Sequence, residues 1–162
     1  MASYATTLTA TYISPLNDVE RINGFNTKFV IPYSFVAQAS ATTATDVVTV
    51  TLGNTPANWA VDRARAIVTT AFSGTTALTI QVGSTSSVAA FITAQSVLTV
   101  ASLGMASTLP VLTNATATAA VSLVATFTNA TGGSPSAVTA GSVTVLLDVA
   151  DVANDPLYQP GQ

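Results

Sequence analysis

Apolar residues alternate with Thr, Ser or Gln over most of this chain, and this period of two constrains its fold more than any other feature. The clearest example is the stretch 64–82. Two alternating runs there flank a short loop at 73–76 that contains a glycine, and this pattern predicts a β-hairpin. Because successive side chains of a strand point to opposite faces, each run would bury one face and expose the other.

Similar runs recur along the chain, with Gly, Pro, Asn and Ser between them. No helix of any length is predicted, and the segment 88–92 fits either one helical turn or a bulged strand. Pro32 lacks a backbone donor and predicts a sheet edge or a bulge. Strands are predicted at 28–38, 46–52, 64–72, 78–82, 96–100, 109–113, 119–128 and 142–149, with a further edge strand within 4–13.

About eight such strands predict an all-β protein, an antiparallel β-sandwich of the jelly-roll type. An immunoglobulin-like sandwich is the alternative, but the chain has no Cys for the usual disulfide between its sheets. We predict the sandwich at 29–150, an extended N-terminal arm at 1–28 and an extended C-terminal tail at 151–162. The arm is either a solvated leader or an anchor that reaches a neighbouring subunit.

Charged residues are sparse, at 7% of the chain, against about 25% in an average domain. Either the chain is a monomer with a surface coated by hydroxyl groups, or much of its surface is buried against other subunits. Sparse charge favours association. The net charge of −3 argues against a nucleic-acid partner. No apolar stretch predicts a transmembrane helix, and the first residues do not resemble a signal peptide, so we expect synthesis in a cytoplasm.

The residue types of common active sites are missing, because the chain has neither His nor Cys. Carboxylate-pair hydrolysis would need two acidic groups to converge, and Asp46 and Asp148 could do so, although each also fits an exposed strand end. An oxygen-rich group that could suit Ca²⁺ lacks the loop motif of an EF-hand; it consists of Asp148, Asp151, Asn154 and Asp155. We therefore predict a non-enzymatic protein without a cofactor or metal.

Two further features have more than one interpretation. Arg63 and Arg65 would share one face of a strand, where they either bind a partner carboxylate or form part of a solvated face. Trp59 is the only Trp of the chain. Beside its loop it would serve as a core or corner plug, or as a stacking platform for a ligand.

Sparse charge, alternating strands rich in Thr, Ala and Val, and arms at both ends resemble small structural proteins of tailed-bacteriophage virions. The segments 59–66, 78–82, 119–127 and 140–149 are similar to jelly-roll proteins among phage head-decoration (cement) and fibre components. The resemblance covers 29–150. It implies a homo-oligomer, typically a trimer, that binds the major capsid protein in the virion and reinforces the shell, without a nucleic-acid or membrane partner.

In this interpretation the arms carry the partner contacts, through aromatic and charged side chains. The residues predicted for these contacts are Tyr4, Tyr12, Asp18, Glu20, Arg21 and Tyr158. The alternative function is a glycan-binding module of a phage tail fibre or a lectin-like adhesin, in which Trp59 or the Tyr residues would stack on sugar.

Overall fold

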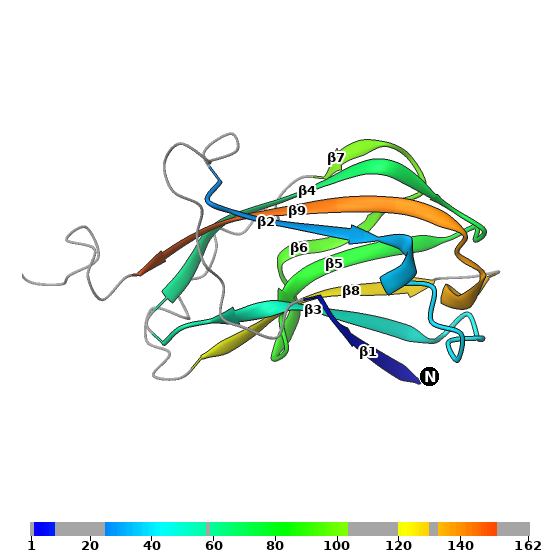
Figure 1. Ribbon diagram of the computed structural model, residues 1–162, viewed down its shortest axis with the longest axis horizontal. Coiled ribbons are helices and arrows are strands. Elements are labelled where there is room, and N and C mark those ends of the chain that lie inside the picture. The colour runs from blue at the N-terminus through cyan, green and yellow to red at the C-terminus, as the bar shows by residue number, and fades with distance from the viewer. Residues whose placement is uncertain (1, 9–24, 58, 104–119, 130–132, 152–162) are drawn as a thin grey trace, which may run out of the picture.

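The computed structural model describes residues 2–8, 25–57, 59–103, 120–129 and 133–151, and these form a two-layer β-sandwich (Figure 1). Sheet A has five strands, in the order β1 (Ser3–Thr7), β3 (Val47–Thr55), β8 (Val121–Asn129), β5 (Leu78–Ser84) and β6 (Ser87–Ser96). Sheet B has four, in the order β2 (Thr27–Pro32), β9 (Ala140–Asp151), β4 (Trp59–Ser73) and β7 (Ala101–Leu103). The predicted all-β sandwich is therefore confirmed.

The strand pairs of the two sheets are nested in the sequence. β2 pairs with β9, β3 with β8, β4 with β7 and β5 with β6, and every one of these pairs is antiparallel. The pairs β4–β9 and β5–β8, also antiparallel, complete the two sheets. Only the β1–β3 pair is parallel among the described residues. The chain thus follows the path of one long two-stranded ribbon folded over on itself.

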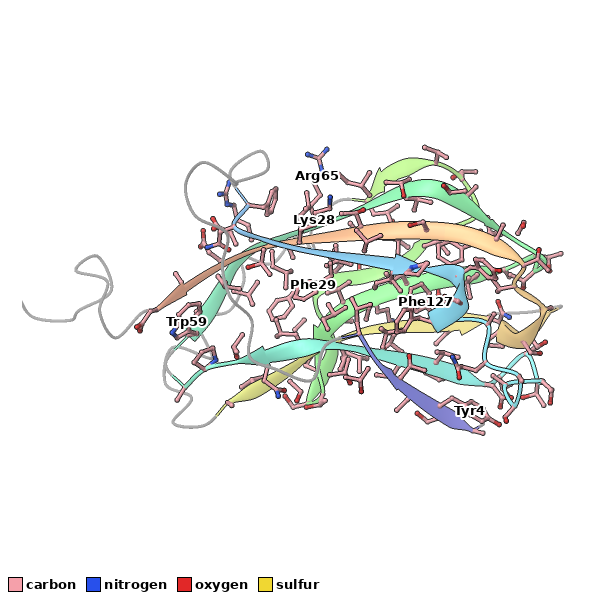
Figure 2. The ribbon with its side chains drawn as sticks, in the orientation of Figure 1. Tyr4, Lys28, Phe29, Trp59, Arg65 and Phe127 are labelled. Atoms are coloured by element: carbon pink, nitrogen blue, oxygen red, sulfur yellow. The ribbon has the colours of Figure 1, made fainter. Side chains whose placement is uncertain are left out.

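The core lies between the layers and is built from the inward residues of the alternating runs. Val48 and Val50 of β3 are fully buried, as are Leu78 and Ile80 of β5. Figure 2 shows Phe127 between the two layers, where its ring centroid lies 5.9 Å from that of Phe72. The faces predicted from the period of two are therefore those that the structure buries.

The predicted hairpin at 64–82 is wrong, because its two strands lie in different sheets. β4 belongs to sheet B and β5 to sheet A. The chain crosses between the layers after Ser73, where Val97 links the two strands: Phe72 donates to its carbonyl, and its own amide donates to Leu78. A hairpin and a crossing both point the same alternate side chains into the core, so the local pattern does not distinguish them.

Other predicted strands differ at their ends. β2 stops at Pro32 on the edge of sheet B, as Pro32 predicted, and a 3₁₀ turn (Tyr33–Phe35) follows it. The segment 88–92 belongs to β6, which pairs with β5 through two register shifts, so the bulged-strand interpretation holds. Residues 97–100 are not a strand, since β6 ends at Ser96 and β7 starts at Ala101. The strand predicted at 109–113 lies outside the described residues.

Part of the expected N-terminal arm contributes to the sheets. Ser3–Thr7 is the edge strand β1 of sheet A, and Thr27 and Lys28 open β2 in sheet B. Residues 9–24 and 152–162 lie outside the part of the chain that the structure describes, and so does most of the expected tail.

Gly141, at the start of β9, makes a close approach that only glycine permits. Its φ is +134°, and a Cβ there would overlap the ring of Phe72. We expect Gly141→Ala to lower the free energy of unfolding by about 2–3 kcal/mol, from backbone strain and overpacking. Gly133→Ala is the control, because its Cβ would meet the movable side-chain hydroxyl of Thr75. Equal losses of stability for the two variants in urea unfolding would contradict this explanation.

Candidate interaction surface

Charge is segregated between the two sheets. None of the five described strands of sheet A contains Asp, Glu, Lys or Arg. The charged residues of the described strands all belong to sheet B; they are Lys28, Asp62, Arg63, Arg65, Asp148 and Asp151. One outer surface of the sandwich is therefore built from uncharged strands, and the charged residues of the described strands lie in the other sheet.

The outward side of sheet A is lined with small hydroxyl and amide side chains in rows across the strands. Thr49 of β3, Thr126 of β8 and Gln81 of β5 form one row. In the next row the hydroxyl oxygens of Thr79 and Thr128 lie 2.9 Å apart. We call this surface the hydroxyl face and define it by Thr49, Thr51, Thr79, Gln81, Ser122, Thr126 and Thr128.

The centre of the hydroxyl face contains an unsatisfied polar group. Thr126 is only 4% exposed, and its Oγ1 has no hydrogen-bond partner among the described residues. A buried hydroxyl without a partner costs about 1–3 kcal/mol. The described residues alone therefore leave a polar group at the centre of this face unsatisfied.

The outer side of sheet B carries an ion pair that the sequence did not predict. Arg63 donates from Nε and Nη2 to one carboxylate oxygen of Asp148, at 3.2 and 2.6 Å. Its guanidinium also stacks over the ring of Phe25, 5.2 Å from the centroid. The hydrogen bond to Asp148 raises the pKa of Arg63 above its ordinary value. Of the two interpretations of Arg63, a carboxylate on a partner or a solvated face, the structure shows neither alone, because Asp148 of the same chain supplies a carboxylate.

Arg65 and Lys28 lie on this same side, in one row with Leu146 of the central strand β9. Figure 2 shows both cationic side chains pointing away from the core. The prediction that Arg63 and Arg65 share a face is therefore confirmed, and the face is the outer surface of sheet B.

Asn26, next to Phe25, fixes the start of β2 against β9. Its side-chain amide donates to the carbonyl of Val149 at 2.7 Å and accepts from the amide of Val149 at 2.9 Å. Asn26 is 7% exposed, so both bonds are buried. The side chain thus replaces one backbone partner in the sheet, a role that no local motif predicted.

The two carboxylates considered for acid–base chemistry do not converge. Asp46 directly precedes β3, whereas Asp148 lies near the end of β9, and these strand ends are at opposite ends of the sandwich (Figure 1). The described residues contain no cluster of three or more acidic, His or Cys side chains suited to a metal. Of the oxygen-rich group, Asp148 pairs with Arg63, while Asn154 and Asp155 lie outside the described residues. The described part of the chain also has no helix able to cross a membrane.

Of the residues predicted for partner contacts, the structure describes Tyr4 alone. It lies on β1, half-buried against the core, at the edge of sheet A. Tyr12, Asp18, Glu20, Arg21 and Tyr158 lie outside the described residues. Trp59 opens β4 and packs half-buried against the core at one end of the sandwich, as a corner plug would (Figure 2).

Asp46 holds β1 and β3 together at their starts. Its carboxylate accepts from the backbone amides of Thr43 and Ala2, at 3.0 and 3.1 Å. These bonds, the one to Thr43 foremost, lower the pKa of Asp46 below its ordinary value of 3.8. A lowered pKa means that the unfolded chain takes up the proton at higher pH than the folded chain does, so this stabilisation is lost as the pH falls below about 4.

We therefore expect the free energy of unfolding to decrease less between pH 5 and pH 3 in Asp46→Asn than in the native chain, by roughly the contribution of this one group. Urea unfolding at several pH values measures the two slopes. If the free energy of unfolding falls equally in the two chains between pH 5 and pH 3, the role given to Asp46 is contradicted.

The geometry defines a class of protein: a two-layer antiparallel sandwich with one charge-free outer surface. No protein-family model, curated protein or solved structure matches the chain.

Proposed function

We propose that the chain is a non-enzymatic structural protein of a bacteriophage virion, a decoration protein. Its jelly-roll body associates with copies of itself, and the assembly binds the major capsid protein and stabilises the shell. The protein is made in the host cytoplasm and incorporated into the virion. Its partners are itself, as a trimer, and the shell.

The observation that carries this proposal is the charge-free sheet A. Sheet faces exposed to water ordinarily carry charged residues, and their depletion is typical of surfaces buried in protein interfaces. The hydroxyl face presents a surface of threonines with an unpartnered hydroxyl, that of Thr126, at its centre. Burial of this face against another copy would desolvate no charged group of its strands.

The nested strand pairing supports the jelly-roll part of the proposal. Eight strands paired as β2–β9, β3–β8, β4–β7 and β5–β6 follow from folding a ribbon twice into Greek keys. In this proposal the predicted arm at 1–28 and tail at 151–162 supply the contacts to the shell. Several weak arm contacts for each assembly would add through their high effective concentration.

Immunogold electron microscopy of virus particles from the source of this chain tests the proposal. Regular labelling of the heads is expected, whereas labelling of the tails alone would refute a head decoration. Chain found only in the soluble fraction would refute a virion role altogether. In a second experiment, a full-length chain with Asp18→Ala, Glu20→Ala and Arg21→Ala should sediment with the particles far less than the native chain does, because it lacks the charged arm contacts but keeps β1 in sheet A.

The glycan-binding alternative depends on an accessible aromatic platform. Trp59 is partly exposed but packs against the core, which leaves less than a full ring face for a sugar. We expect the fluorescence of Trp59 to be unchanged by a panel of oligosaccharides at millimolar concentration. A saturable change of emission with one of them would favour the glycan-binding module over the decoration protein.

A further inference from the structure

We propose that β1 is exchanged between copies, so that residues 3–7 of one chain pair with β3 of a second. This inference rests on the self-association in the proposed function and specifies how the copies are joined. Three features of the described residues support it: the weak attachment of β1, the length of its connection to β2, and the nature of the β3 edge.

β1 is attached to the sandwich at one edge only. It pairs only with β3, in parallel, from Ser3 opposite Val47 to Thr7 opposite Thr51. None of its side chains is fully buried; Tyr4 is only half-buried. An element that buries so little apolar surface opens at low free-energy cost.

The connection after β1 is long enough to reach another molecule. Residues 9–24, between the described segments 2–8 and 25–57, could span about 50 Å when extended. The radius of gyration of a domain of this size is about 15 Å. A segment of this length permits β1 to bind its own β3 or that of a neighbour.

The edge of β3 accepts a strand and contains nothing that repels one. β3 has no Lys and no Pro within Val47–Thr51, whereas the β2 edge of sheet B carries Lys28 and Pro32, which block pairing. Asp46 and Thr51 fix the register, since Asp46 accepts from the amide of Ala2 and Thr51 accepts from that of Leu8. A strand from a second copy would make the same bonds, so exchange loses none of them.

The absence of Cys from the chain makes a disulfide test clean. Ala5 and Thr49 are Cα partners in the β1–β3 register and both point outward, at a spacing suited to a disulfide. Chains with Ala5→Cys alone and Thr49→Cys alone are mixed, unfolded, refolded together and oxidised. Exchange predicts covalent heterodimers on non-reducing gels. An equal mixture of Ala5→Cys with Thr93→Cys, an exposed position on β6 at the opposite edge of sheet A, should give far fewer.

The double variant Ala5→Cys/Thr49→Cys decides between the two arrangements in a single chain. Disulfides between chains support exchange, and a disulfide closed within each monomer overturns it. Failure of both kinds of bond to form at this register would also overturn it. A native chain that stays monomeric would refute the self-association itself, whereas an assembly with disulfides closed within its chains would refute only the exchange.

Discussion

Two lysines on the hydroxyl face, Thr49→Lys with Gln81→Lys, are expected to prevent self-association while leaving the sandwich folded. The two positions flank Thr126 in one row of sheet A. Both side chains are half-buried in the single chain, so lysines there can extend into water and the fold tolerates them. In an interface they would become buried charges without partners, which costs about 3–5 kcal/mol each.

A loss of that size weakens association more than about 100-fold, and sedimentation velocity measures it. The matched control is Thr69→Lys with Thr70→Lys, which adds the same charge at exposed positions of β4 in sheet B. The control should assemble as the native chain does. If both double variants assemble normally, or both dissociate, the hydroxyl face is not the contact surface.

Asn26→Ala is expected to lower the free energy of unfolding by about 3 kcal/mol, a large effect for a polar substitution among the described residues. The variant leaves the buried amide and carbonyl of Val149 without partners, and each unsatisfied group costs about 1–3 kcal/mol. The hydroxyl of Thr27, which donates to the Asn26 side chain at 3.1 Å, also loses its acceptor.

Asn54→Ala is the control, because Asn54 is half-buried and accepts from the Ser122 hydroxyl, which can turn to water. Thermal and urea unfolding measure both variants. A loss for Asn26→Ala no larger than for Asn54→Ala would mean that Asn26 does not anchor β2 to β9.

The alternating pattern predicted the core faces but not the sheet to which each strand belongs. Val48, Val50, Leu78 and Ile80 lie on the apolar faces of their runs and are buried, since a period of two fixes the buried face whatever the strand pairs with. The crossing at 73–77 was missed for the same reason. The neighbours of β4 are β9 and β7, and their distance in sequence leaves no local trace.

For the candidate surfaces too, the local sequence predicts which face a residue lies on but not which strands lie beside it. The shared face of Arg63 and Arg65 follows from their spacing, but Asp148 as partner depends on a pairing between strands that are 85 residues apart. The charge-free sheet A could be found only once β1, β3, β5, β6 and β8 were known to lie together, because no single strand is unusual. The arm contacts of Tyr12, Asp18, Glu20, Arg21 and Tyr158 stay predictions.

The solution mass of the native chain, measured by light scattering on a sizing column over a wide concentration range, tests the central claim most directly. A chain of 16.3 kDa that buries its hydroxyl face against copies of itself should elute as a stable assembly. A trimer would have a mass of about 49 kDa, three times that of the chain. A mass of 16.3 kDa at every concentration would contradict self-association through sheet A, and with it the exchange of β1.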